Sequence, residues 1–351
     1  MSNQKIAFVT CTQLIIMEKL RKIYRILRRY YRQSKISKDS SVKIFNYQLY
    51  NNKNYSLLQT ESVENHWLAK FIIEKKYLAN TNKTVSIFGV NGDRLAIHIN
   101  RSDYKIFYTV ENVHVKLSPW YQYQDLLIND MGIDLSLGFD YVENNKYLRF
   151  PYWLMTLFEP TDNYEIIKQK CNHINKIPSI DNRLKFCSFI CRNDYFGDRK
   201  YFLEEVQKIG YINCPGNFMH NDDDLSIIFN DDKIKYLQQF KFNLCPENSN
   251  NNGYVTEKIF DSIKAGCIPI YWGSNNQPEA DILNQNAIFF LNLHANNEDV
   301  LKEIKKIYLN ENLYKIFILQ NKLTSKAPDI IYNYFQNLDK KLKEIFKTIN
   351  S

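Results

Sequence analysis

A threonine, a glutamate and a lysine stand side by side at the start of a helix predicted in the second half of the chain. Thr256 is a residue type that often precedes a first turn, which would hold Glu257 and Lys258. Free N–H groups there attract a phosphate oxygen, and the lysine adds a full charge. Glu257 could accept hydrogen bonds from two neighbouring hydroxyls, such as those of a ribose. An isolated Thr-Glu-Lys is more often an ordinary exposed helix start, so these residues alone indicate a nucleotide site only weakly.

The elements around this helix must form a strand, a loop, the helix and a second strand. Apolar residues predict strands over Phe240–Leu244 and Cys267–Trp272, and Gly266 is suited to end the helix before the second strand. Glu247 and Asn248 follow the first strand. Ligands of parallel sheets bind outside the carboxyl ends of strands, so we expect both side chains to face the same crevice as the helix start.

This segment resembles the signature of fucosyltransferase family 10, the α1,3/α1,4-fucosyltransferases. The family pattern is roughly Y-K-F-x-L-x-F-E-N-S, a short loop, Y-[IV]-T-E-K, and a strand with I-P-[IV]. The matching residues are Lys241, Phe242, Leu244, Glu247, Asn248, Ser249, Tyr254, Val255, Thr256, Glu257, Lys258, Ile268, Pro269 and Ile270. The chain departs from the pattern at Pro246, where the family usually has phenylalanine.

Two earlier segments resemble the same family and contribute one charged residue each. The predicted strand Lys105–Tyr108 runs into Thr109-Val110-Glu111-Asn112, where the family has T-G-E-N, so the resemblance implies that Glu111 is the catalytic base. Arg199 follows the predicted strand Lys185–Ile190 and begins a helix, matching the arginine that contacts the donor diphosphate. A guanidinium can hold two phosphate oxygens at once. Without the resemblance, both side chains would be taken for ordinary surface residues.

Several other polar groups have a simpler structural interpretation. Asp140 and Arg149 are either partners in an ion pair or part of the acceptor side, and we favour the structural role. The acidic run Asp222–Asp224 is typical of a solvated loop, although it could suggest a metal. The loop Cys214–Asn217 differs from the family's Gly-rich run, which leaves the shape of the donor's base or sugar pocket open. The seven cysteines form no CxxC pair and fit buried, reduced thiols of a cytoplasmic protein.

The alternation of strands and helices predicts an α/β fold with parallel sheets. The resemblance covers about residues 41–330 and implies the GT-B glycosyltransferase architecture, two Rossmann-like domains with a cleft between them. We expect a basic extension over residues 1–40, an acceptor-binding domain over 41–175 and a GDP-sugar-binding domain over 176–330. A last helix over 331–351 would cross back to the first domain.

The basic character of the chain is confined to its first residues. Residues 1–40 contain ten Lys or Arg and two acidic residues, a net charge of +8 that equals the charge of the whole chain. A nucleic-acid partner is therefore not expected for the body. Met17–Gln33 has the pattern of a basic amphipathic helix, which could lie on an anionic membrane surface or pack on its own domain. The apolar segment 6–17 is too short to span a bilayer.

The resemblance implies an inverting transfer of L-fucose from GDP-fucose to the 3-hydroxyl of GlcNAc or Glc in an acceptor such as N-acetyllactosamine. Glu111 would accept the acceptor's proton, while Arg199 and Lys258 would stabilise the departing GDP. The other expected donor-binding residues are Glu247, Asn248, Tyr254 and Glu257. These cations could replace a metal, so no cofactor is expected to be required, with Mn²⁺ considered only as a stimulator.

Two other functions remain open from the sequence. One is a related transferase that uses a different GDP-sugar, because the departures at Pro246 and Cys214–Asn217 fall near the expected donor site. The other is a non-catalytic carbohydrate-binding or membrane-tethered protein, which only the basic helix favours. We expect a cytoplasmic protein, with any membrane contact peripheral and made through residues 17–33.

Overall fold

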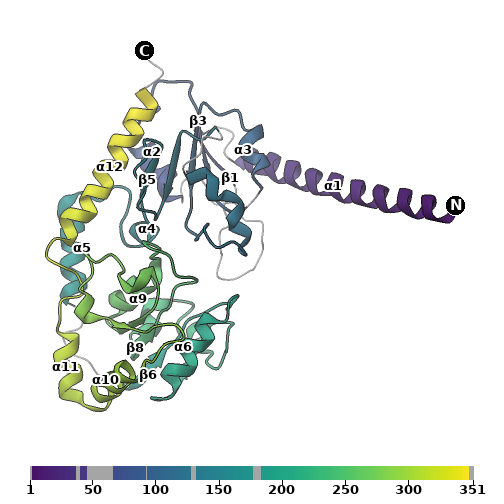
Figure 1. Cartoon of the computed structure of the whole chain (residues 1–351). Helices are drawn as coiled ribbons and strands as arrows, with labels where there is room; N and C mark the ends of the chain where they lie inside the picture. The colour runs from purple at the N-terminus through teal and green to yellow at the C-terminus, as the bar shows by residue number, and fades with distance from the viewer. Residues whose placement is uncertain are drawn as a thin grey trace.

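Two five-stranded parallel sheets, one in each half of the chain, carry the fold (Figure 1). The computed structural model describes residues 2–36, 40–45, 66–91, 93–127, 132–176 and 183–347. Four of the described strands, Val85–Phe88, Leu135–Gly138, Phe240–Leu244 and Ile268–Tyr271, are buried along their whole length, as expected for parallel strands that are covered on both faces. The predicted α/β class with parallel sheets is therefore confirmed.

The first sheet has its strands in chain order. They are β1 (Val42–Phe45), β2 (Val85–Phe88), β3 (Tyr104–Tyr108), β4 (Leu135–Gly138) and β5 (Tyr147–Arg149). The elements between and after them are α2 (Trp67–Glu74), α3 (Leu95–Ile99), the 3-10 helix η1 (Pro119–Leu127), α4 (Trp153–Leu157) and α5 (Tyr164–Lys176). The strand predicted over Lys105–Tyr108 is found as β3, which begins one residue earlier.

The second sheet has the order β10-β9-β8-β6-β7. Its strands are β6 (Lys185–Ser188), β7 (Ile212–Asn213), β8 (Phe240–Leu244), β9 (Ile268–Tyr271) and β10 (Phe289–Phe290). Its helical elements are α6 (Asp198–Gln207), α7 (Asp224–Ile227), α8 (Lys233–Leu237), α9 (Glu257–Ala265), η2 (Ser274–Asn276), η3 (Gln285–Ala287), α10 (Glu298–Leu309) and α11 (Glu311–Ile318). From β6 the chain goes to one side with β7 and returns to the other with β8. The carboxyl ends of β6 and β8 are thus a topological switch point, where open α/β sheets bind ligands.

Helix α9 forms as its sequence predicts. Thr256 is extended at the N-cap (φ −110°), and Gly266 adopts the left-handed conformation at the C-cap (φ 80°), which glycine adopts without strain. The helix buries Ile259, Phe260 and Ile263. Phe260 stacks on Trp153 of the first domain with ring centroids 4.4 Å apart. The helix that carries the Glu-Lys pair is therefore fixed against both domains.

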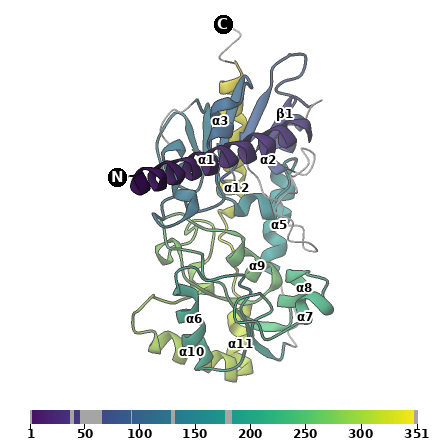
Figure 2. The ribbon, with the colours of Figure 1, turned by 90° about the vertical axis from the view of Figure 1, so that its right-hand side faces the viewer.

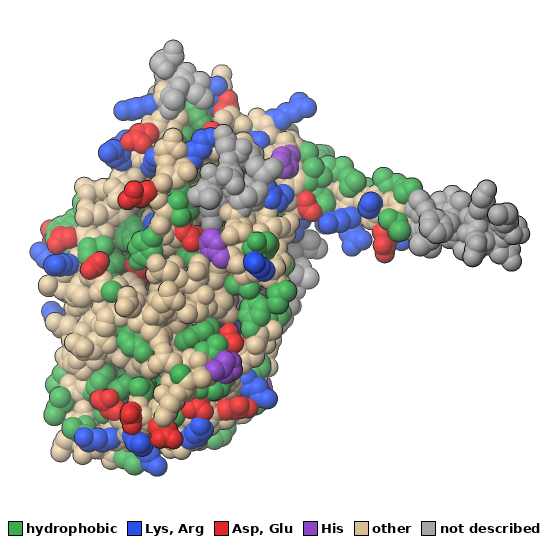
Figure 3. Space-filling model, viewed as in Figure 1, with side chains coloured by type: hydrophobic (Ala, Val, Ile, Leu, Met, Phe, Trp, Pro, Cys, Tyr) green, Lys and Arg blue, Asp and Glu red, His purple; other side chains and the backbone are tan. Residues whose placement is uncertain are grey.

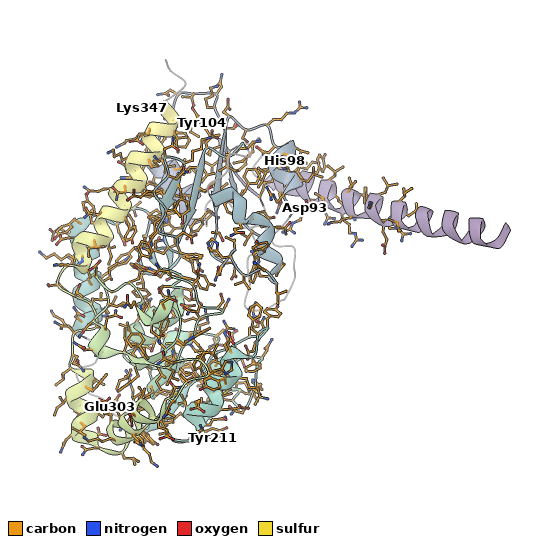
Figure 4. The ribbon with its side chains drawn as sticks, viewed as in Figure 1. Asp93, His98, Tyr104, Tyr211, Glu303 and Lys347 are labelled. Atoms are coloured by element: carbon orange, nitrogen blue, oxygen red, sulfur yellow. The ribbon has the colours of Figure 1, made fainter. Side chains whose placement is uncertain are left out.

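The last helix, α12 (Ala327–Lys347), begins four residues before the expected start at residue 331 and packs on the first domain. Its residues Phe335 and Leu342 are buried in the same core as α5 and the first sheet. Near its end, Tyr104 of β3 lies beside Lys347 (Figure 4) and donates a hydrogen bond to the carbonyl of Phe346. The closing helix thus packs the end of the chain onto the first sheet.

Two helical features are set by local packing and capping. Residues 160–183 have little apolar periodicity, yet α5 spans Tyr164–Lys176 and buries three residues, Ile167, Cys171 and Ile174. Helices α10 and α11 are separate, because Asn310 is extended between them and its side chain accepts a hydrogen bond from the amide of Leu313. A coarse periodicity of apolar residues resolves neither feature.

The first helix, α1 (Ser2–Ile36), projects from the first domain (Figures 1 and 2). The apolar segment 6–17 is part of it. At the base of α1, Tyr30 stacks on Phe45 with centroids 4.9 Å apart, and Arg29 donates a hydrogen bond to the Asn91 carbonyl. Within the described residues, no helix combines the length and apolar character that crossing a bilayer requires.

Candidate functional site

A cavity between the two domains is lined by polar residues from both. The first domain supplies Glu111, Asn112 and neighbours after β3, and the second supplies loops that follow β6 and β8. The lining residues are Glu111, Asn112, Val115, Ser118, Trp120, Asn193, Asp194, Tyr195, Phe196, Arg199, Asn248, Ser249 and Tyr254. The structure therefore brings together four of the predicted site residues, Glu111, Arg199, Asn248 and Tyr254.

Glu111 is held at the end of β3 by the preceding threonine. The Thr109 hydroxyl donates to the Glu111 carbonyl at 2.7 Å and accepts from the Glu111 amide at 3.2 Å. Glu111 Oε2 lies 3.5 Å from both the Tyr254 hydroxyl and the Asn248 side-chain nitrogen. Beside it, Asn112 donates to the Ser249 hydroxyl at 2.9 Å. The T-x-E-N and E-N-S segments thus meet across the domain boundary.

The surroundings of Glu111 make it a weaker acid than an ordinary glutamate. Burial raises its pKa to about 7, against the opposing charges of Lys258 and Arg199. Burial and the nearby Glu111 charge raise the pKa of Tyr254 well above its usual range, so the tyrosine keeps its proton. The cavity therefore holds a carboxylate that can take up a proton near neutral pH, beside hydroxyl and amide donors.

Lys258 is held by a buried carboxylate. Glu247 has no exposed surface, and its Oε2 accepts hydrogen bonds from Lys258 Nζ at 3.0 Å and from the Thr256 hydroxyl at 2.6 Å. Its Oε1 accepts from the Thr256 amide at 2.8 Å and, more weakly, from the Tyr271 hydroxyl at 3.4 Å. Glu247 was expected to bind the donor, and in the structure its carboxylate anchors the start of α9 and the lysine.

A second cavity lies at the topological switch point. Its lining includes three cations and two carboxylates, which are Arg199, Lys233, Lys258, Glu257 and Asp261. Burial disfavours the charge on Glu257, but Lys258 and Lys233 more than offset it and lower its pKa. Conversely, burial and the neighbouring Glu257 raise the pKa of Asp261 to about 6. This cavity therefore offers positive charge beside a carboxylate that stays ionised.

Arg199 joins the two cavities. It is 7% exposed, and its guanidinium donates to the Asn193 carbonyl at 2.6 Å and to the Glu247 carbonyl at 3.4 Å. These two acceptors are neutral backbone oxygens, and a third contact at 3.4 Å is with the Cys191 sulfur, so the three contacts fix the guanidinium without a carboxylate partner. Lys233 was not predicted, because no residue pattern marks the short helix α8 and an isolated lysine gives no signal of its own.

Asp140 and Arg149 are not partners of each other. Asp140 lies 2.7 Å from His114 Nε2, while Arg149 forms a buried ion pair with Glu279 of the second domain at 2.6 Å. The structural role favoured for Arg149 holds, with a different partner. No cluster of three or more His, Cys, Asp or Glu side chains that could bind a metal is found in the part of the chain that the structure describes.

Comparison with known proteins agrees with this arrangement. The family model described as glycosyltransferase family 10 (fucosyltransferase) C-term matches residues 180–328. An α-(1,3)-fucosyltransferase from Helicobacter pylori is 30% identical over 274 residues, covering 70% of this chain and 52% of that protein, so the chain spans about half the length of this relative. A putative fucosyltransferase of Acanthamoeba polyphaga mimivirus is 27% identical over 163 residues, covering 44% of this chain and 27% of that protein.

Solved structures extend the likeness to both domains. A crystal structure of α1,3-fucosyltransferase superposes with a TM-score of 0.59 at 20% identity, covering 88% of this chain and 90% of that one. Another, with GDP-fucose, gives a TM-score of 0.51 at 22% identity, covering 81% and 89%. The two sheets together have the GT-B fold, and residues 180–328 of this chain match the C-terminal fucosyltransferase model of glycosyltransferase family 10.

Proposed function

We propose that this chain transfers L-fucose from GDP-fucose to a glycan acceptor, at the 3-hydroxyl of a GlcNAc or Glc residue and with inversion at C1. The observation that carries the proposal is the position of Glu111. Its carboxylate comes from one domain and lies against Asn248 and Tyr254 of the other, in a cavity shared with Arg199. Related proteins named as α1,3-fucosyltransferases, one solved with GDP-fucose, support this choice of reaction.

On the acceptor side, Glu111 acts as the general base. The acceptor hydroxyl oxygen attacks C1 of fucose, the bond from C1 to the β-phosphate oxygen breaks, and Glu111 takes the hydroxyl proton. Its pKa of about 7 lets the carboxylate be ionised before the reaction and protonated after it. The donors of Tyr254 and Asn248 hold the carboxylate and the sugar in place.

On the donor side, the cavity at the switch point receives GDP. The positive charges of Arg199, Lys233 and Lys258 stabilise the negative charge that grows on the diphosphate as the bond breaks. The free N–H groups at the start of α9 add to this stabilisation. Glu257, kept ionised by the two lysines, accepts hydrogen bonds from the ribose hydroxyls. The buried carboxylate of Glu247 accepts a hydrogen bond from Lys258 and so fixes the position of its ammonium group.

These cations supply the charge that a divalent ion supplies in other nucleotide-sugar transferases, so we propose that no metal is required. We expect transfer in the presence of EDTA to stay within about twofold of the rate without it. A loss of activity that Mn²⁺ or Mg²⁺ restores would contradict this part of the proposal.

The main test is the variant Glu111→Gln, which keeps the size of the side chain and removes the base. We expect fucose transfer to fall by at least ~100-fold, as for other general bases, while the affinity for GDP measured by calorimetry stays near wild type. The control is Glu143→Gln, an exposed carboxylate of the same domain. Turnover retained by Glu111→Gln on an acceptor array would refute the assignment.

A donor other than GDP-fucose is the second candidate. Pro246, the departure from the family pattern, lines the cavity at the switch point next to Lys258. A panel of GDP-sugars distinguishes the two, because the donor that the enzyme hydrolyses fastest without acceptor identifies the sugar. Faster hydrolysis of another GDP-sugar than of GDP-fucose would favour this candidate.

We further propose that α1 binds the cytoplasmic face of an anionic membrane. Beyond its base the helix exposes apolar side chains, among them Leu20, Ile23 and Leu27, with basic residues on its other face (Figure 3). Such a helix lies in the interface, where each basic residue contributes about 1 kcal/mol. The buried free thiols fit a reducing compartment. We expect sedimentation with phosphatidylserine vesicles but not phosphatidylcholine vesicles, and loss of this difference in Arg25→Glu/Arg28→Glu would support α1 as the contact.

A further inference from the structure

A third cavity, which the proposed reaction does not use, lies at the carboxyl edge of the second sheet. We call it the Asn-rich cavity, and it is lined by Asp198, Asn250, Trp272, Asn275, Asn276, Asn292 and Leu293. These residues belong to segments that follow the carboxyl ends of β6, β8, β9 and β10. The cavity therefore opens at the same edge of the sheet as the two cavities of the proposed active site.

The Asn-rich cavity adjoins the cavity that contains Glu111. Asp198 directly precedes Arg199 in the sequence. Asn250 follows Asn248 by two residues, so the Cα atoms of these two asparagines lie within ~7 Å of each other. Asn248 and Arg199 line the Glu111 cavity, whereas Asn250 and Asp198 line the Asn-rich cavity. A ligand that reacts at Glu111 and extends past this loop would enter the Asn-rich cavity.

The lining differs in chemistry from the cavity at the switch point. It contains four asparagines, one aspartate, a tryptophan and a leucine, and no lysine or arginine is among the described residues that line it. A diphosphate would find no positive charge there. Amide groups both donate and accept hydrogen bonds, and the apolar surfaces of Trp272 and Leu293 lie among them. This combination suits an uncharged ring that carries hydroxyl groups.

The wall of the cavity is fixed in an unusual backbone conformation. Ser274, Asn275 and Asn276 all have left-handed φ values, of 49°, 52° and 54°. The run is held by the Asn275 amide, which donates to Asn250 Oδ1 at 2.7 Å, and by Asn276 Nδ2, which donates to the Leu291 carbonyl at 2.9 Å. The amides that line the cavity are therefore positioned before any ligand arrives.

We propose that the Asn-rich cavity binds an uncharged sugar residue of the acceptor glycan that lies beyond the N-acetyllactosamine unit receiving fucose. The inference rests on the proposed function, since it presumes that the Glu111 cavity holds the reacting hydroxyl. It adds a source of selectivity for acceptor length, because only a glycan long enough to reach past Asn248–Asn250 contacts these amides.

The test removes two amides without disturbing the backbone. Asn275→Gly keeps a residue that tolerates positive φ, and Asn292→Ala truncates an exposed side chain. The matched control is Asn80→Gly/Asn286→Ala, because Asn80 also has positive φ and Asn286 is exposed on the same domain as the cavity, which neither residue lines. Both double variants and the wild type are assayed with N-acetyllactosamine and with its trimer as acceptors, and for hydrolysis of GDP-fucose without acceptor.

We expect Asn275→Gly/Asn292→Ala to raise KM for the trimer by about tenfold, since two hydrogen bonds are lost, with KM for the disaccharide and GDP-fucose hydrolysis unchanged. An equal KM for the trimer in the variant and the wild type would overturn the proposal. So would a raised KM for GDP-fucose, which would place the donor's own sugar in the cavity. If the wild type transfers fucose from GDP-fucose to neither acceptor, the proposed function itself fails, and that result is distinct from a variant with no effect.

Discussion

At the scale of single residues, one buried carboxylate connects the two halves of the proposed chemistry. Glu247 accepts hydrogen bonds from Lys258 and Thr256, and Lys258 in turn opposes the rise in the pKa of Glu111. Burial disfavours the charge on Lys258, but Glu247 and Glu257 more than offset it and raise its pKa. The lysine therefore stays charged at neutral pH, close to both the proposed diphosphate site and Glu111.

The pH dependence of transfer follows from the raised pKa of Glu111. A general base must be ionised, so activity should be lost as the pH falls below its pKa of about 7 and should be complete above it. We expect kcat/KM for the acceptor, measured between pH 5 and 9 with saturating donor, to rise tenfold per pH unit below this value and then level off. A profile that stays flat between pH 5.5 and 7.5 would exclude Glu111 as the base.

Lys258→Ala separates donor binding from base catalysis. The variant removes a charged hydrogen-bond donor from the cavity at the switch point, so we expect GDP affinity measured by calorimetry to fall by at least about tenfold. Because Lys258 also lowers the pKa of Glu111, the acid limb of the pH profile should move to higher pH. Lys235→Ala, an exposed lysine of the same domain, is the control. Unchanged GDP affinity in Lys258→Ala would count against its assigned role.

At the scale of elements, the loop between β8 and α9 depends on a close approach of backbones. Gly253 has φ +77°, and a Cβ at this position would lie 2.7 Å from the Phe139 carbonyl of the first domain. The next residue, Tyr254, packs against the Phe139 ring with centroids 4.9 Å apart. The absence of a side chain at Gly253 thus lets Tyr254 reach Glu111.

Gly253→Ala should therefore impair both stability and transfer. The positive φ costs about 1–3 kcal/mol of unfolding free energy, and the clash with Phe139 adds to it by separating the loops that meet at Glu111. The control is Gly132→Ala, which has φ +76° and space for a Cβ, so it should show only the cost of φ. We expect urea denaturation and kcat to distinguish the two variants. Equal losses of stability and kcat in the two variants would show that the contact with Phe139 contributes to neither.

How far the sequence predicts the structure depends on how local the determining contacts are. Strand β8 and helix α9 are predicted almost to the residue, because a short apolar run, an N-cap threonine and a C-cap glycine are all local signals. The helix α5 is not predicted, because its apolar residues are few and are buried only by packing on α12, which is distant in the sequence. The partner of Arg149 is unpredictable for the same reason, since Glu279 is 130 residues away.

The candidate site shows the same division. The motifs predicted which residues gather in the cavities, and the structure brings Glu111, Arg199, Asn248 and Tyr254 into one of them. The motifs did not predict that Glu247 would be buried as the hydrogen-bond partner of Lys258. Nor did they predict that Lys233 and the Asn-rich cavity would lie at the same edge of the sheet. Those features depend on how several loops pack together, which no single segment encodes.

At the scale of the whole molecule, the site exists only while the two domains stay docked. The docking is made by α12, by the Trp153–Phe260 stack and by the hydrogen bond from Asn112 to Ser249. Arg149 adds a junction of three elements. It pairs with Glu279, donates to the Phe139 carbonyl at 2.9 Å and contacts the hydroxyl of Tyr334 on α12.

Arg149→Met tests this junction, because methionine keeps much of the volume and removes the charge. Glu279 would be left buried at 3% side-chain exposure without its ion-pair partner, so we expect the free energy of unfolding to fall by ~3–5 kcal/mol. Transfer should fall as well, since Glu111 would lose its fixed position opposite Tyr254. GDP affinity should be retained, because the cavity at the switch point is lined by the second domain alone.

The double variant Arg149→Met/Glu279→Gln identifies the cause. Removing the unpaired carboxylate should restore part of the stability, and the coupling between the two sites measures the pair. Arg101→Met, an exposed arginine of the first domain, should leave urea denaturation and transfer near wild type. If Arg149→Met lost GDP affinity together with transfer, the damage would extend into the second domain. The claim that the second domain binds the donor while the first supplies the catalytic base Glu111 would then fail. Transfer lost with GDP binding intact is the result that a site assembled by domain docking requires.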